Sequence, residues 1–498
     1  MIQRRTLALL PAALLAAGLP IAGQAQSKKD TMVLAMALEP TGLDPTAGAA
    51  SAIAEIVLYN VFETLTKIGP DGNVTPLLAE SWEISPDLKT VTFKLRKDAK
   101  FQNGEPFNAQ TVKYSFTRAG AEKSTNKDKR LFQAMEFIGT PDAYTVVIGM
   151  KTIEPDLLFL LGQATAIMVE PKSSETNATQ PVGTGPFKLD NWAKGSSVTL
   201  VRWPGYRNAA SIKLNKVTFR FISDPAAQVA ALLSGDVDAF QRVGAARSLA
   251  QIKSDGRFQV ITAGSRAKTI LAINNKKKPL DDVRVRRAIS AAIDRKAVIE
   301  GAADGLGAPI GSHYVPGALG YVDTTGINPF NIEKAKALLK EAGVTTPLEL
   351  TMKLPPPPYA RQGGEVIAAE LREVGINLEI IPVEWADWLK GVYTDKDYDF
   401  SIVSHTEAND IDIYARPNYY IGYENADFNK MAADLQIAND AAKRKELLGE
   451  MQKKLATDVP VVFLFELPKV GVWDAKVEGM WENSPIQAND LTKVKWAE

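Results

Sequence analysis

The two histidines of this chain, His313 and His405, are its only imidazole groups. They lie far apart in the sequence and form neither an HExxH nor an H-x-x-x-H pattern, which argues against a metalloprotease or a structural zinc site. The chain has no cysteine, so thiol nucleophiles, disulfides and cysteine-based zinc or iron–sulfur sites are excluded. We therefore expect neither a metal nor a cofactor.

Other catalytic patterns are equally weak. The chain contains no GxSxG and no GxxxxGK[ST], which removes the usual hydrolase elbow and phosphate loop. The residues 265–268 fit S-x-x-K, but that chemistry requires the serine at the start of a helix, and the β-type run TILAINN follows here. Many carboxylates are present, but without a fold none can be paired. The sequence therefore favours binding over catalysis.

Length and composition indicate a large protein with balanced charge. The chain has 498 residues, 45% of them hydrophobic, and a net charge of +0. This length exceeds what one domain usually holds. The basic runs KLRKDAK and NNKKK are short and are typical of solvated surfaces, so we expect no nucleic-acid partner.

The N-terminus has the pattern of a secretory signal peptide. Arg4 and Arg5 precede an apolar run at 7–22 that two prolines interrupt, and 23–25 offers a small-x-small cleavage site. RRTL is a loose match to a twin-arginine signal, and general secretion is the expected route. Because no cysteine can carry a lipid after cleavage, we expect a mature protein without a lipid anchor, in the periplasm.

Short apolar strands alternate with amphipathic helices along the chain, which predicts an α/β fold. The run at 31–37 is typical of a strand. Asp224 caps a predicted helix with Pro225 at its first position and Gly235 at its end. Asn331 caps another helix of the same design. No short internal repeat is present, so a solenoid is not expected.

The stretch 77–118 combines a hairpin with a capped helix. Trp82 is predicted to start a strand, Ser85-Pro86-Asp87 to form a turn, and TVTFKLRKDAKF to return as a second strand. Asn103-Gly104 predicts a further turn. Asn108 is predicted to cap the helix that follows.

This order of elements, with its string W-x-x-S-x-D-x-x-x-x-x-F-x-L-R-x-x-x-x-F-x-x-G-x-x-x-x-A, resembles the family-5 extracellular solute-binding proteins. These are the peptide- and nickel-binding components of bacterial ABC importers. Further matching segments follow in order: EIVLYNVFETLTKI (55–68), VGTGPFKL (182–189), VTLVRWPGYR (198–207), ALLSGDVDAF (231–240), NNKKKPLDDVRVRRAISAAIDR (274–295), NIEKAKALLKEAG (331–343) and KLATDVPVVFLF (454–465). The resemblance covers the chain from about residue 31 to residue 476.

The resemblance implies a periplasmic binding protein-like fold of type II, with two α/β lobes and an extra subdomain inserted in lobe I. The implied division is a signal peptide at 1–25, lobe I at 27–60, 186–270 and 468–498, the inserted subdomain at 61–185, and lobe II at 271–467. The implied function is capture of a solute by lobe closure and its delivery to membrane permease subunits. We expect a monomer without enzymatic activity.

The family also implies where solute contacts lie. Asp410-Ile411-Asp412 resembles the D-P-D of a loop whose acid holds the ligand ammonium in dipeptide-binding relatives, so Asp410 is the candidate amine anchor, with a turn-capping role as the alternative. His405 stands where relatives often have a tryptophan and is a candidate pocket residue. Nickel-binding relatives use a pocket histidine, so a nickel chelate stays open as a ligand.

Two further segments match ligand-contacting positions of the family. In the crossover, Arg266 and Lys268 are candidates for a solute carboxylate, or an outward-facing pair. The EPTGLDP segment at 39–45 either lets backbone approach a solute or forms a plain turn. The tract at 355–358 predicts an extended loop. Near it peptide-binding relatives often carry an arginine, and Arg361 is the candidate here, although it is also typical of a helix start.

Aromatic residues complete the candidate site. Tyr414 and Tyr420 offer a rigid amphipathic lining, and Trp385 is a candidate for stacking on a solute, with core packing as the alternative. The expected solute is a short peptide or a similar small molecule with amine and carboxylate groups. A nickel chelate, an opine, a sugar and, in another class, a secreted periplasmic hydrolase are the alternatives.

Overall fold

The computed structural model describes residues 29–48, 50–243, 249–318, 320–407, 409–438 and 440–497. The predicted signal peptide at 1–25 lies outside these ranges. Within them, every helix is too short or too polar to cross a bilayer.

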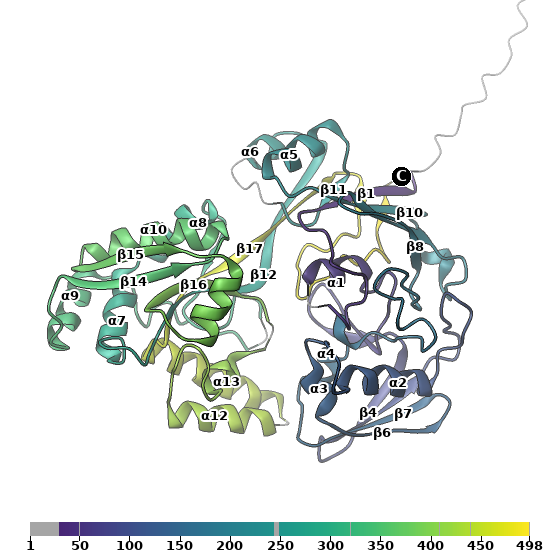
Figure 1. Ribbon diagram of the computed structural model, residues 1–498, viewed down its shortest axis with the longest axis horizontal. Helices are drawn as coiled ribbons and strands as arrows, with labels where there is room; N and C mark the ends of the chain where they lie inside the picture. The colour runs from purple at the N-terminus through teal and green to yellow at the C-terminus, as the bar shows by residue number, and fades with distance from the viewer. Residues whose placement is uncertain are drawn as a thin grey trace, which may run out of the picture.

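One large mixed sheet runs through both halves of the molecule (Figure 1). Its strands lie in the order β15 (Ile376–Pro382), β14 (Leu348–Leu354), β16 (Phe400–His405), β12 (Phe258–Ile273), β17 (Val461–Asp474), β11 (Ala239–Phe240), β1 (Thr31–Met36), β10 (Lys216–Phe221), β9 (Ser197–Arg202) and β8 (Phe187–Ala193), and β13 (Ala308–Pro309) pairs with β17. The α/β fold class predicted from the sequence is confirmed.

The long strands β12 and β17 pair antiparallel and form a ribbon that connects the two lobes (Figure 1). We call the half with β1 and β8–β11 lobe I and the half with β14–β16 lobe II. The ladder of the ribbon is irregular between Ala263 and Ala267, where the register shifts. The predicted lobe borders at 270/271 and 467/468 fall inside these two strands, and the division of the chain stays a prediction.

Lobe I packs its helices on a buried apolar core. These helices are α1 (Ser51–Val57), α5 (Pro225–Ser234) and α6 (Leu249–Lys253). The Asp224 side chain accepts a hydrogen bond from the Ala227 N–H, Pro225 occupies the first turn, and Gly235 ends the helix in the left-handed region, so the predicted capping of α5 is confirmed.

A second, antiparallel sheet forms a separate layer within the chain segment predicted to be inserted in lobe I. Its strands are β4 (Ala79–Ile84), β5 (Thr90–Leu95), β7 (Thr145–Met150) and β6 (Met135–Asp142), covered by α2 (Ala109–Gly120) and flanked by α3 (Lys129–Gln133) and α4 (Leu157–Leu160). Asn108 caps α2 as predicted. The predicted strand start at Trp82 is wrong, because backbone pairing extends β4 back to Ala79, opposite Leu95.

Lobe II has helices on both faces of its sheet (Figure 1). They are α7 (Val283–Ala292), α8 (Arg295–Ala303), α9 (Ile332–Glu341) and α10 (Pro358–Arg372) on one core, and α11 (Trp385–Trp388), α12 (Ala426–Ile437) and α13 (Ala441–Asp458) around the other. The extended tract predicted at 355–358 ends one residue early, because Pro358 already begins α10. Proline suits a first helical turn, where its missing N–H costs nothing.

The two glycines of VGTGPFKL let two backbone segments cross in direct contact. A Cβ on Gly183 would lie 1.9 Å from the Val61 carbonyl oxygen, and one on Gly185 would lie 2.4 Å from the Asn60 carbonyl oxygen. The Gly185 N–H donates to the Val61 carbonyl at 2.9 Å, which fixes the crossing. The motif therefore joins the two segments at either end of the part predicted to be inserted, 61–185.

Substitution of Gly183 by alanine is expected to lower the free energy of unfolding by about 1–3 kcal/mol, since the new methyl group meets backbone that cannot rotate away. Urea unfolding of the purified variant measures this loss. Gly256→Ala is the matched control, because a Cβ there meets no atom within 4 Å and it should change the stability little. Equal stabilities of the two variants would contradict the close crossing.

Candidate functional site

A cavity of about 930 Å³ lies between lobe II and the part of the chain that carries the second, antiparallel sheet and α4. Its walls come from 152–163 around α4, from 406–416 and the facing helices α12 and α13, and from the C-terminal loop 484–487. Figure 1 shows α12 and α13 opposite α3 and α4 across this space. Both halves of the molecule therefore contribute to the walls of the cavity.

Asp410 lines this cavity and belongs to a buried charged network. The Lys268 ammonium lies 2.8 Å from its Oδ1, and both side chains are less than a tenth exposed. The His313 Nε2 lies 3.0 Å from the same oxygen. Lys268 also donates to the Glu407 carbonyl. The structure thus brings the candidates Asp410 and Lys268 into direct contact.

The protonation states in this network follow from burial and neighbouring charge. Burial raises the pKa of Asp410, but His313 and Lys268 outweigh it and hold that pKa far below its ordinary value. Burial lowers the pKa of His313, despite Asp410, and lowers that of His405 to about 3. Both imidazoles are therefore neutral. Since a carboxylate only accepts, the His313 Nε2 donates to it, and its Nδ1 accepts from the Tyr414 hydroxyl at 3.0 Å.

The predicted aromatic and histidine candidates divide into two groups. His405 and Tyr420 stack, and the His405 Nε2 lies 3.0 Å from the Tyr420 hydroxyl. Tyr414 and Tyr420 are buried behind the Asp410 network and support it from the core, outside the described cavity wall. Trp385 is 41% exposed and packs edge-on against Trp388, away from that wall.

The two arginine candidates do not join the network among the described residues. Arg361 is half-exposed and its guanidinium lies 3.4 Å from Glu384, which fits a surface residue of α10. Arg266 has a φ of +59° in the irregular part of β12. Its guanidinium points to the turn between β2 (Thr66–Ile68) and β3 (Val74–Pro76), where a Cβ on Gly72 would lie 2.3 Å from Nη2.

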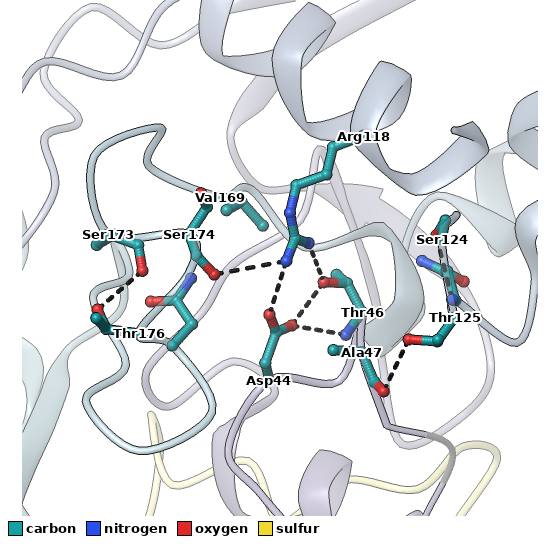
Figure 2. Close-up of polar contacts among 12 residues, drawn as sticks. Asp44, Thr46, Ala47, Arg118, Ser124, Thr125, Val169, Ser173, Ser174 and Thr176 are labelled. Carbon is teal, nitrogen blue, oxygen red and sulfur yellow. Dashed lines mark hydrogen bonds and ion pairs between the residues drawn. The ribbon is translucent and has the colours of Figure 1, made fainter. Parts of the chain in front are cut away.

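The EPTGLDP segment is a structural turn held by an arginine of α2. Figure 2 shows Asp44 accepting from the backbone N–H and the hydroxyl of Thr46, while Arg118 contacts both residues and the Ser174 carbonyl. The Thr125 hydroxyl donates to the Ala47 carbonyl on the same turn. Because these contacts use both oxygens of the Asp44 carboxylate, a structural role in the turn is sufficient to explain this residue.

Several cavity residues were missed from the sequence. The Asp156 Oδ1 accepts a hydrogen bond from the Asn409 amide at 3.3 Å and lies 4.0 Å from the Arg444 guanidinium, which are contacts across the cleft. Burial raises the pKa of both Asp156 and Glu154. These groups lie in loops and at helix ends without a spacing pattern, so no sequence signal marked them.

Electrostatics argue against a metal site at this wall of the cavity. His405, Glu407 and Asp410 offer ligand atoms within 4.8 Å of one another. The Lys268 ammonium already neutralises Asp410, however, so the Glu407 carboxylate alone would offset the double charge of a divalent ion. The donor set therefore fits an ion pair better than a bound metal.

Comparison with known proteins places these features in a family. The description "Bacterial extracellular solute-binding proteins, family 5 Middle" matches residues 73–427. The chain is 29% identical over 404 residues to the dipeptide-binding protein of Escherichia coli K12, covering 74% of each chain. It is 28% identical over 401 residues to the heme-binding protein A of Haemophilus influenzae, covering 73% of this chain and 72% of that one.

Solved structures agree with the fold. A periplasmic binding protein from A. tumefaciens R10, solved in complex with agropinic acid, superposes with a TM-score of 0.79 at 27% identity, covering 94% of this chain and 99% of that chain. A Haemophilus parasuis protein named HbpA2 superposes with a TM-score of 0.85 at 22% identity, covering 94% of this chain and 100% of that chain.

Proposed function

The chain belongs to the bacterial extracellular solute-binding proteins of family 5, and from this premise we propose that it captures a short peptide, or a related solute with amine and carboxylate groups, in the cleft between its lobes. It is a solute-binding protein of an ABC importer. The observation that carries the proposal is the cavity of about 930 Å³, whose walls come from both halves and bear charges of both signs.

Capture proceeds by closure of the lobes around the solute. A solute that contacts both walls stabilises the closed arrangement by its differential affinity for the two arrangements. The contacts of Asp156 with Asn409 and Arg444 already bridge the walls. The permease subunits then recognise the closed protein and their ATPase supplies the work, while the binding protein cleaves no bond.

The Asp410 wall is the proposed anchor for the solute amine. Lys268 and His313 both contact Oδ1, which leaves the second carboxylate oxygen for an N–H of the solute. Lys268 is already paired with Asp410. We therefore assign the binding of the solute carboxylate, which was expected of Lys268, to Arg444, which lines the cavity. A charge-assisted hydrogen bond of this kind contributes about 1.5–3 kcal/mol.

The proposed setting is the periplasm, reached by cleavage of the N-terminal signal peptide and without a lipid anchor. The proposed partners are the membrane permease subunits of the importer, and the proposed oligomeric state is a monomer. Family membership and the pattern of Arg4, Arg5 and the apolar run at 7–22 support this location.

The proposal predicts that Ala-Ala binds with a dissociation constant in the micromolar range, about −8 kcal/mol, and that N-acetyl-Ala-Ala binds at least tenfold more weakly because it lacks the ammonium. Isothermal titration calorimetry on protein freed of copurified solute by partial unfolding and dialysis measures both. Equal affinities for the two peptides would contradict the assignment of Asp410 as the amine-binding residue. Absence of binding by any short peptide would remove the peptide function.

An opine is the second candidate solute, because the relative solved with agropinic acid is 27% identical over nearly the whole chain. A thermal-shift panel with agropinic acid, glutathione, a nickel–histidine chelate and maltose ranks it against the remaining classes. Chromatography of the solute recovered after incubation separates capture from hydrolysis, since only an enzyme returns cleaved product.

A further inference from the structure

A second, smaller recess of about 160 Å³ lies in lobe I. It is lined by the ends of β1 and β11, by α1 and by the C-terminal loop. The strands β1 and β11 are parallel neighbours in the sheet, and both end at this recess. In α/β folds, ligands bind in the crevice at the carboxyl ends of such strands.

Three residues of this recess carry buried oxygen atoms that have no hydrogen-bond partner among the described residues. They are the Gln241 Oε1, the Ser484 Oγ and the Asn489 Oδ1. Each of these residues is 5% exposed. A buried polar atom without a hydrogen-bond partner is unfavourable and is rare in folded proteins, so three of them around one small recess require an explanation.

The orientation of both amides is fixed by their nitrogen atoms. The Gln241 Nε2 donates to the Trp481 carbonyl at 2.7 Å, and the Asn489 Nδ2 donates to the Glu55 carbonyl at 3.0 Å. Turning either amide over would break that bond and place an oxygen against a carbonyl. The unpartnered Gln241 and Asn489 atoms are therefore acceptors that call for N–H or O–H donors, and the Ser484 hydroxyl can accept from the same kind of group.

Buried hydrogen bonds hold the walls of this recess in place. The Lys469 ammonium donates to the Trp481 carbonyl at 2.6 Å, and the Asn60 amide donates to the Asn489 carbonyl at 2.8 Å. These buried contacts hold the C-terminal loop against β17 and against the residues that follow α1. A donor that enters the recess therefore meets acceptors whose positions are already set.

Ser484 connects this recess with the large cavity, because it lines both. We propose that the recess is a second solute subsite that takes an N–H donor group, a carboxamide or a primary amine, on a side chain of the solute captured in the cleft. This inference rests on the proposed function and narrows it to solutes that carry such a donor in addition to the amine at Asp410.

Matched dipeptides test this subsite by calorimetry. Ala-Gln, Ala-Lys and Ala-Met, each also in the reversed order, carry unbranched side chains that differ in their donors. We expect wild-type protein to bind the Gln or the Lys peptides at least tenfold more tightly than the Met peptides. The Gln peptides report a neutral donor and the Lys peptides a cation.

Ser484→Ala is the decisive variant, since it removes an unpartnered oxygen and no described hydrogen bond of its side chain. It should reduce the donor preference at least fivefold and leave the melting temperature of the solute-free protein unchanged or higher. Thr324→Val removes an equally unpartnered buried hydroxyl that lies outside both cavities and should keep the preference.

The outcomes separate the subsite from the function. Equal binding of all three side chains, or an intact preference in Ser484→Ala, overturns the subsite while capture of peptides stands. A lower melting temperature of solute-free Ser484→Ala shows that the hydroxyl has a partner in the protein, which also overturns it. Failure of every dipeptide to bind wild-type protein overturns the proposed peptide function and this inference together.

Discussion

Replacement of Asp410 by asparagine is expected to lower the free energy of unfolding by about 3–5 kcal/mol. The Lys268 ammonium, 5% exposed, would lose its counter-charge and stay buried without compensation. Urea unfolding followed by tryptophan fluorescence measures the loss. Because the pKa of Asp410 is far below its ordinary value, the pair is fully present above about pH 4 and is lost only as the pH falls further.

A double substitution separates the charge from the loss of packing. In the Lys268→Met/Asp410→Asn protein no charge of the pair remains, and most of the lost stability should return. Asp412→Asn is the control in the same loop, because the Asp412–Arg416 pair is largely exposed and should contribute less than about 1 kcal/mol. A loss below about 1 kcal/mol in Asp410→Asn would show that His313 and the backbone alone hold the wall.

The Lys268→Met/Asp410→Asn protein also tests the role of Asp410 in solute binding. The proposed anchor uses the carboxylate, so the double variant should fold and yet bind Ala-Ala at least tenfold more weakly than wild type. A stable double variant with full affinity would assign the amine to other acids of the cavity, and Glu154 and Asp156 on the opposite wall are candidates.

Glu63→Gln is expected to lower the free energy of unfolding by a similar amount, about 3–5 kcal/mol. The Glu63 carboxylate accepts two hydrogen bonds from the Arg207 guanidinium at 2.7 and 2.6 Å and one from the Tyr206 hydroxyl at 3.2 Å. The charged side chains are 5% and 2% exposed. A glutamine cannot accept both guanidinium bonds and leaves the arginine charge unpaired.

Arg207→Lys extends the test, because an ammonium cannot form the paired geometry of a guanidinium and should also cost stability. Lys172→Gln is the surface control, since the Lys172–Glu105 pair is exposed and its loss should be small. Thermal unfolding by circular dichroism compares the three variants. If Glu63→Gln and Lys172→Gln shift the melting temperature equally, the buried pair does not stabilise lobe I.

Much of the local structure could be predicted because its causes are local. Asn108, Asp224 and Asn331 cap helices through their own side chains, within three residues. The one-residue error at Pro358 and the early start of β4 depend on pairing and packing that short patterns do not contain. The lobe arrangement could be expected only from the family resemblance.

The proximity of some candidate site residues could be expected from the family resemblance, and their role in binding stays a prediction. Asp410, Lys268 and His405 came from family positions and lie together, whereas His313 was set aside because no spacing pattern linked it to them. Its contact with Asp410 joins residues 97 positions apart. Trp385 and Arg361 have the residue types of a binding wall, but their exposure depends on how α10 and α11 pack, which the sequence alone does not specify.

The irregular ladder of the connecting ribbon has a mechanical consequence. Lys268 stands one residue beyond the register shift in β12, so the strand that would bend when the lobes move also carries the cation that positions Asp410. The conformation of β12 and the position of the positive charge at the cavity wall are therefore set by the same strand. A change in the curvature of β12 would therefore move the Lys268 ammonium, and its contact with Asp410, directly.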